Sequence, residues 1–427
     1  MNYLNEKRDS VLRKVAHQFG TPLYIYDNEE IEGNYLSLKK SFSNQVDVFY
    51  SLKANPNLAI ATIFRQLGAG AEVCSLTELK IALLAGYRPR DIIFVGPAKK
   101  PEEIVCALEN KIYAIACESI DEFNLINELA KTRSVVANIA IRINPAFSIR
   151  NASLKMGGVP SQFGIDQVDV FKNKKFFLEK NNINIIGIHV FSGTRILEYS
   201  TLIDNTRNIF ALSDALSTDW GVHFQMVDIG GGIGVPYFKN ETKFDMAMLH
   251  KSIHPLLADY SSHRKMRVIL ESGRYLMASA GIFVTRIDYI KESQGVKFLI
   301  TDGGMNCHLT AAGYGSLLKR NFPIKLLSES ISTNNETYHI TGPLCTPADV
   351  IGRAVELPEA KTGDYIAIDA SGAYGPSASP VLFLGHGYPN EVLMYKDKLQ
   401  LIRERDTPDD FLRKQFILTQ ANTCQHA

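Results

Sequence analysis

Eight short runs of β-branched and apolar residues recur before residue 274, and stretches with helical spacing and charged residues separate them. Strands that alternate with helical segments predict βα units and a parallel sheet. Eight such units predict a (β/α)8 TIM barrel. The predicted strands lie in 46–52, 70–75, 92–96, 112–117, 137–143, 185–191, 224–231 and 267–273.

The pattern changes after about residue 280, where β-branched and aromatic segments are bounded by turn residues and helical spacing is scarce. This pattern predicts a separate β domain. The N-terminal residues carry a short predicted helix, which Gly20 ends, and then a strand-like run, TPLYIYD. We therefore expect a barrel over 28–279 and a β domain built from 280–427 together with 1–27.

The charges and the cysteines argue against several functional classes. The 427 residues are 45% hydrophobic and 21% charged, and the net charge of +1 gives no sign of a nucleic-acid partner. No apolar run is long enough to span a bilayer, and the charged N-terminus lacks a signal-peptide core, so we expect a cytoplasmic protein. The six cysteines form no CxxC pair, so neither a disulfide framework nor a metal site is expected.

Residues that follow the predicted strands are the first candidates for a site, because TIM-barrel chemistry lies at the carboxyl ends of the strands. Lys53 closes the first run in YSLKANPN. A lysine in an apolar pocket can lose its proton and form a Schiff base, although a surface lysine is the alternative for this residue alone. Glu271, Gly273 and Arg274 close the eighth run in ESGR, where an ordinary ion pair is the alternative.

A glycine triplet, Gly230, Gly231 and Gly232, follows the seventh run. Its backbone N–H groups can approach a phosphate closely, and the last loops of TIM barrels are frequent phosphate sites. Thr194, after the sixth run, offers a hydroxyl to the same group. An ordinary glycine-rich turn is the alternative.

Two further candidates lie in loops of the predicted β domain. Cys345 stands in GPLCTPAD and Tyr374 in SGAYG, and the flanking glycines and prolines indicate shaped loops. Each residue taken alone is also compatible with a core or turn position.

Seven motifs, in order along nearly the whole chain, resemble the fold-type-III pyridoxal-phosphate (PLP) decarboxylases, the group of ornithine, arginine and diaminopimelate decarboxylases. The resemblance implies an alanine-racemase-like barrel, bound PLP and decarboxylation of an α-amino acid. A racemase on the same barrel is disfavoured by Glu271, because an acidic partner of the pyridine nitrogen strengthens the electron sink. An inactive regulatory paralogue is disfavoured by the presence of Lys53 and Cys345, and a barrel-only PLP carrier by the β domain. The motifs are YSLKANPN, GAEVCSLTEL, HVFSGT, DIGGGIGVPY, ESGR, GPLCTPAD and SGAYG.

The resemblance also implies a role for each candidate. Lys53 is expected to hold PLP as a Schiff base, and Glu271 to partner the pyridine nitrogen. Cys345 is expected to reach the active site of a neighbouring subunit and to protonate the intermediate after CO2 leaves, which implies a homodimer with shared sites. The other expected cofactor-binding residues, mostly around the phosphate, are Thr194, Gly230, Gly231, Gly232, Gly273, Arg274 and Tyr374.

Several positions depart from the family pattern. Many members carry a ring-stacking histidine at the position matched to Phe191, two residues after His189, and here the phenyl ring is expected to stack instead. Thr346 stands where diaminopimelate and ornithine decarboxylases have an acid that pairs with the distal ammonium of the substrate. An arginine of an IRPALY-like segment is replaced by Thr310, while Tyr314 is retained.

These departures predict a substrate whose distal end is neutral or carrier-linked, because leaving a buried ammonium unpaired costs several kcal/mol. Thr346, Tyr314 and His308 are the expected substrate-binding residues, with a structural histidine as the alternative for His308. KMGGVPSQFG, DGGMNCH and FLGHGYPNEVL resemble a narrower branch. That branch includes decarboxylases of glutamyl groups carried as acyl-carrier-protein thioesters in antibiotic pathways such as butirosin biosynthesis. A decarboxylase of free diaminopimelate or ornithine is the alternative, with Asp349 holding the distal ammonium.

Overall fold

The computed structural model describes residues 3–42, 45–148, 154–238, 240–262, 264–313, 320–330, 332–396 and 398–418. The chain divides into two compact units, a barrel unit (27–281 with 372–377) and a β unit (1–26, 282–371 and 378–427). The segment 372–377 was expected within the β domain, whereas it groups with the barrel. The Gly372 N–H donates to the Ala278 carbonyl at 3.1 Å and the Tyr374 N–H to the Ala54 carbonyl at 2.8 Å, which explains the difference.

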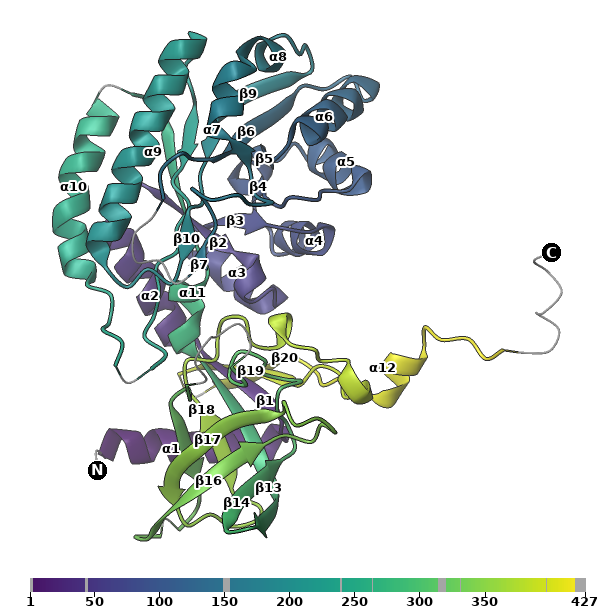
Figure 1. The fold of residues 1–427 in the computed structure, drawn as a ribbon. Helices are drawn as coiled ribbons and strands as arrows, with labels where there is room; N and C mark the ends of the chain where they lie inside the picture. The colour runs from purple at the N-terminus through teal and green to yellow at the C-terminus, as the bar shows by residue number, and fades with distance from the viewer. Residues whose placement is uncertain are drawn as a thin grey trace. The chain divides into compact units, whose positions relative to one another are not determined.

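Eight parallel strands close into a barrel, which confirms the predicted (β/α)8 fold (Figure 1). The strands pair in the order β2-β3-β4-β5-β6-β9-β11-β12, and β12 pairs back to β2. Each run that the sequence predicts overlaps one of them. They are β2 (Asp47–Ser51), β3 (Gly70–Val73), β4 (Ile92–Phe94), β5 (Ala114–Cys117), β6 (Ala137–Asn144), β9 (Ile183–His189), β11 (Met226–Asp228) and β12 (Arg267–Ser272).

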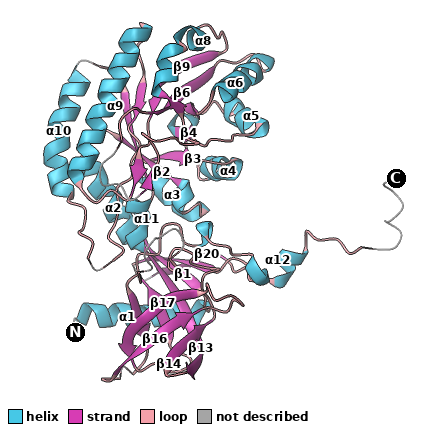
Figure 2. Cartoon of the chain, in the orientation of Figure 1, coloured by secondary structure: helices cyan, strands magenta, loops and turns pink. Residues whose placement is uncertain are grey.

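Helices follow the barrel strands and surround them (Figure 2). Their ends are set by local chemistry: the Ser75 hydroxyl accepts a hydrogen bond from the Glu78 N–H at 3.2 Å at the start of α4, and Gly68, with φ +90°, ends α3. The helices are α2 (Asn28–Ser41), α3 (Leu58–Leu67), α4 (Leu76–Leu84), α5 (Pro101–Glu109), α6 (Ile120–Thr132), α7 (Gln167–Lys172), α8 (Lys174–Leu178), α9 (Tyr199–Trp220), α10 (Met246–Ser262) and α11 (Arg274–Met277). Short strands β7 (Leu154–Lys155), β8 (Ile165–Asp166) and β10 (Gly193–Thr194) lie in the connecting segments.

Apolar side chains fill the barrel. Two glycines make room for two of them: a Cβ on Gly70 would lie 2.4 Å from the Phe49 ring, and one on Gly187 would lie 2.7 Å from the Met226 Cγ. Close packing of this kind resists displacement, so the strand ends hold fixed positions. The cluster comprises Phe49, Ile93, Val95, Ala114, Ala116, Ala140, Ile186, Met226 and Ile269.

The β unit is a mixed sheet in which the N-terminal strand β1 lies between β13 and β19. The order along the sheet is β17-β16-β14-β13-β1-β19-β20, and β18 joins β13 to β15. Helix α1 (Tyr3–Phe19) buries Leu12, Val15 and Ala16 against this sheet. The other elements are β1 (Leu23–Asp27), β13 (Gly281–Ser293), β14 (Val296–Thr301), β15 (Ile324–Leu327), β16 (Asn335–Thr341), β17 (Val350–Pro358), β18 (Tyr365–Ile368), β19 (Asn390–Tyr395), β20 (Lys398–Arg403) and α12 (Pro408–Leu412).

Among the described residues, no helix combines the length and the apolar character needed to cross a bilayer.

Candidate active site

Lys53 lies just after β2, in a short 3-10 turn, and its ammonium is paired inside the barrel. Its Nζ lies 2.7 Å from Oε1 of Glu72 on β3 and 3.9 Å from Sγ of Cys74. The Glu72 side chain is fully buried, whereas the Lys53 side chain is 36% exposed, so the lysine is accessible from the rim. Burial lowers the pKa of Lys53, but its charged neighbours, Glu72 and Glu271 among them, outweigh burial and hold that pKa well above its usual value.

The proton on Lys53 bears on its chemistry, because imine formation needs the neutral amine. Glu72 accepts a hydrogen bond from the ammonium and so favours the protonated form of Lys53. Cys74 donates from Sγ to the same Glu72 oxygen at 3.0 Å. Burial and Glu72 raise the pKa of Cys74 well above its usual value, so the thiol stays neutral.

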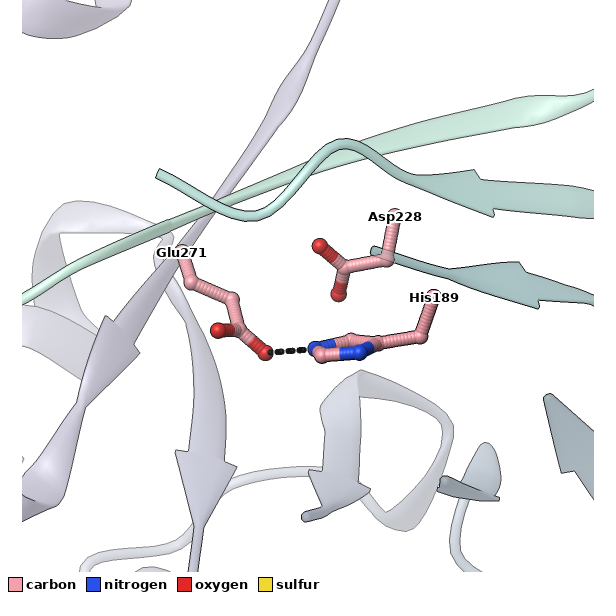
Figure 3. Close-up of side chains that lie close together, drawn as sticks. All are labelled: His189, Asp228 and Glu271. Carbon is pink, nitrogen blue, oxygen red and sulfur yellow. Dashed lines mark hydrogen bonds and ion pairs between the residues drawn. The ribbon is translucent and has the colours of Figure 1, made fainter. Parts of the chain in front are cut away.

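A second buried cluster joins the ends of three neighbouring strands (Figure 3). His189 ends β9, Asp228 ends β11 and Glu271 lies in β12, and their nearest polar atoms lie within 4.8 Å of one another. The His189 Nε2 lies 3.0 Å from the Glu271 Oε1. Burial favours the neutral form of Glu271, but His189, Lys53 and Arg142 lower the pKa overall and keep the carboxylate ionised.

The glycine triplet turns next to this cluster. A Cβ on Gly231 would lie 1.8 Å from the Glu271 carbonyl oxygen, and one on Gly230 would lie 2.5 Å from the Val190 carbonyl. Gly232 has φ +90° and packs against the backbone of Gly193, next to Thr194. Only glycine fits these positions, so the loop presents bare backbone to the rim.

Arg274 begins the helix α11 after β12, and aromatic side chains surround its guanidinium. Its Nη1 donates to the Tyr237 hydroxyl at 2.9 Å, and its guanidinium carbon lies 4.6 Å from the centre of the Tyr374 ring. Gly273 has no space for a Cβ, which would lie 2.7 Å from the Ala54 Cβ. Arg274 is thus held beside the turn that carries Lys53. Phe191 also lies at this rim, with its ring centre 5.6 Å from the Lys53 Nζ.

The remaining predicted residues belong to the β unit. Cys345 is exposed and Thr346 follows it in the loop between β16 and β17, where the Thr346 hydroxyl accepts a hydrogen bond from the Ala348 N–H at 3.3 Å. His308 is buried, and its ring contacts Ser371 Oγ at 2.9 Å and the Ala311 N–H at 3.3 Å. Burial lowers the pKa of His308 to about 3, so the ring is neutral. These contacts use both ring nitrogens and favour the structural alternative. Tyr314 lies outside the described residues.

The barrel site fits PLP by the polar atoms that it leaves unpaired. Among the described residues, Glu271 Oε2, His189 Nδ1 and Arg274 Nε are buried without a hydrogen-bond partner. A carboxylate oxygen matches a protonated pyridine nitrogen, and a guanidinium beside bare backbone N–H groups matches a phosphate. Lys53 lies at the same rim and supplies the amine.

Three residues of the site were not among the predicted ones: Glu72, His189 and Asp228. Each lies in or at the end of a predicted strand, and a buried strand seldom carries charged or titratable side chains. That rule could have singled out all three. His189 contacts Glu271 and Phe191 lies near Lys53, so two rings are candidates to contact the cofactor.

Comparison with known proteins finds relatives along almost the whole chain. Residues 28–278 match the family model described as pyridoxal-dependent decarboxylase, pyridoxal binding domain. The chain is 38% identical to the L-glutamyl-[BtrI acyl-carrier protein] decarboxylase of Niallia circulans, over 94% of this chain and 95% of that protein. It is 34% identical to the diaminopimelate decarboxylase of Methanocaldococcus jannaschii, over 95% and 93%. A crystal structure of a diaminopimelate decarboxylase from M. jannaschii superposes with a TM-score of 0.85 at 34% identity, covering 95% of this chain and 94% of that one. The chain therefore belongs to the pyridoxal-dependent decarboxylases and is a PLP-dependent carboxy-lyase.

Proposed function

We propose that this enzyme decarboxylates an α-amino acid whose distal end is neutral because it is joined to a carrier, such as a glutamyl or aspartyl thioester. Secondary-metabolite or siderophore biosynthesis is the setting that we infer for such a substrate. The observation that carries the proposal is the loop after β16, GPLCTPAD, which offers no free acid to a distal ammonium.

Asp349 is the one acidic residue of that loop, and its carboxylate is already engaged. Oδ1 accepts a hydrogen bond from the Met305 N–H at 2.6 Å, and Oδ2 accepts one from the Leu344 N–H at 2.8 Å. The residue is 2% exposed. Asp349 thus holds the Cys345 loop in place. Turning its side chain toward a substrate would leave the Met305 and Leu344 N–H groups without an acceptor. Thr346, which is accessible, carries no charge.

The relative from Niallia circulans supports the same substrate class. Its printed name gives a glutamyl group on an acyl-carrier protein as what it acts on, and it matches this chain over 94% of its length. A thioester carbonyl is neutral, so a threonine hydroxyl can face it without the cost of an unpaired charge.

Different residues of the barrel have different roles in the proposed reaction. Glu72 holds Lys53 in place through its ammonium, while Glu271, kept ionised by His189, would stabilise a protonated pyridine nitrogen. Bound PLP supplies an electron sink for the charge that CO2 loss leaves at Cα. Arg274 and the glycine triplet would hold the phosphate end, so that the carboxylate of the substrate could be kept in one orientation.

We further propose a homodimer in which Cys345 of one chain completes the site around Lys53 of the other. Chains that carry Lys53→Ala and chains that carry Cys345→Ala are each expected to be inactive. Mixed after mild dissociation, they should recover about a quarter of wild-type activity, since half of random dimers are mixed and each contains one intact site. No recovery in stable mixed dimers would place both residues in one chain's site.

The test of the substrate is CO2 release from a panel of amino acids. Glutamate and aspartate are offered free and as carrier-protein thioesters, beside ornithine, arginine, lysine and meso-diaminopimelate. Turnover of a thioester alone is the expected result. Thr346→Glu should then raise turnover of free diaminopimelate, because it supplies the missing acid, whereas Ala348→Glu, an exposed change two residues on, should not.

Decarboxylation of a free diamino acid is the second candidate, and the relatives named diaminopimelate decarboxylase favour it. Brisk turnover of free diaminopimelate or ornithine by the unchanged enzyme would establish it and refute the thioester proposal. An inactive regulatory paralogue would release CO2 from no member of the panel while still binding PLP.

A further inference from the structure

Asp228 is buried in the cofactor site, yet the roles derived above do not use it. It is 0% exposed and lies at the end of β11, between the strands that carry His189 and Glu271. Its register neighbour on β9 is His189. A carboxyl group in such a place is costly unless its oxygens are bonded or protonated.

One oxygen of Asp228 is tied to the glycine loop. Oδ1 accepts a hydrogen bond from the Gly230 N–H at 2.8 Å, and the Gly230 carbonyl accepts one from the Glu271 N–H at 2.7 Å. The start of the triplet is thus fixed at two points. The next residue, Gly231, is pressed against the Glu271 carbonyl.

The same carboxyl group also faces the His189–Glu271 pair. Asp228 belongs to the cluster of three polar groups within 4.8 Å, and Figure 3 shows its carboxyl group directed toward His189 and Glu271. Oδ2 has no hydrogen-bond partner among the described residues, and neither has His189 Nδ1. Burial and the Glu271 charge raise the pKa of Asp228 well above its usual value, which agrees with one carboxylate, not two, in this space.

We propose that Asp228 is a positioning residue that couples the two ends of the cofactor site, because it bonds the Gly230 loop through Oδ1 while its buried carboxyl group lies against the His189–Glu271 pair. Asp228 acts through its hydrogen bonding and its shape, not through a negative charge. A backbone hydrogen bond from the Glu271 N–H to the Gly230 carbonyl already links these two parts of the site, and the Asp228 side chain adds a second link. This inference rests on PLP binding alone and does not depend on which amino acid is the substrate.

Two nearly isosteric changes separate shape from charge. Asp228→Asn keeps an acceptor for the Gly230 N–H and an amide that can donate, whereas Asp228→Leu removes both. Asp121→Asn, on the exposed face of α6, is the matched control. Apoenzyme is titrated with PLP for the dissociation constant, and the His189 ring resonances of the apoenzyme are followed by NMR.

The proposal predicts that Leu raises the PLP dissociation constant at least about tenfold and shifts the His189 resonances. Asn and the control should stay within about threefold of wild type, with His189 unchanged. Wild-type behaviour of folded Asp228→Leu would overturn the proposal, because no coupling would be lost. A folded Asp228→Asn variant that binds PLP as weakly as Asp228→Leu would overturn it too, because the negative charge would then be what matters. If the Leu variant does not fold, the Asn result decides alone: wild-type affinity with unchanged His189 resonances supports the proposal, and any other result refutes it.

Discussion

Adding one methyl group at Gly231 should disable cofactor binding without removing a single functional group. The new Cβ would lie 1.8 Å from the Glu271 carbonyl oxygen and 2.9 Å from its carbonyl carbon. Real Cβ atoms essentially never come closer than 3.0 Å to another heavy atom, so the two groups must separate by 1.2 Å, the difference between 3.0 and 1.8. Because Glu271 lies in a barrel strand packed on both sides, the glycine loop has to move.

The cost follows from that movement. Overpacking of this kind destabilises a fold by about 1–3 kcal/mol. A shift of more than an ångström also breaks hydrogen bonds whose donor–acceptor range is about 2.7–3.2 Å, and one such bond to a charged phosphate is worth about 1.5–3 kcal/mol. At about 1.4 kcal/mol per tenfold, Gly231→Ala should weaken PLP binding by about tenfold to a hundredfold.

The assay is a titration of apoenzyme with PLP, followed by the absorbance of the bound cofactor. Gly33→Ala is the control, because Gly33 lies inside α2 with no heavy atom within 4 Å of a built Cβ. There the same change should stabilise the fold by about 0.5–1 kcal/mol, since alanine is the better helix former, and leave the affinity alone. If the two variants bind PLP equally well, the argument from the Gly231–Glu271 contact is refuted.

Three further outcomes are expected. Cys345→Ala should lower turnover by at least about tenfold while changing PLP affinity by less than about threefold, because the thiol acts as a general acid and does not hold the cofactor. Equal losses of turnover and of PLP affinity would contradict that role. Glu72→Gln should lower the pH midpoint for covalent PLP attachment to Lys53, because the anion that raises the lysine pKa is gone; an unchanged midpoint would exclude the pair as its cause. His308 has a folded pKa of about 3 against about 6.5 unfolded, so the unfolded chain binds more protons between these values. The contribution of His308 to stability is therefore complete above about pH 6.5, and it is lost as the pH falls, by up to about 1.4 kcal/mol per pH unit. If the ring is neutral when folded, His308→Gln should flatten the pH dependence of the free energy of unfolding, measured in urea over pH 4–6.5.

The barrel could be predicted from the sequence because its strands are buried on both faces and appear as continuous apolar runs. The candidates Lys53, Glu271 and the glycine triplet were found because each follows or closes such a run. Contacts between strands far apart in sequence were beyond this reasoning. The approach of His189 to Glu271 joins residues 82 positions apart and depends on β11 lying between their strands.

The hydrogen bonds of Asp349 could not be predicted from the sequence either. Its place after Cys345 suggested an acid available to a substrate, but two backbone N–H groups, one of them 44 residues away, occupy its oxygens. Hydrogen bonds from the backbone of another loop leave no mark on sequence composition. The structure was therefore needed to tell a free carboxylate from a structural clamp.

The most direct test of the account is to locate the lysine that carries the cofactor. Holoenzyme is reduced with borohydride to make the lysine–PLP bond permanent, digested, and mapped by mass spectrometry. We expect label on the peptide that contains Lys53, whose ammonium lies at the rim beside Glu72. Label instead on Lys99, a buried lysine that pairs with Glu122, or on no lysine at all, would contradict it.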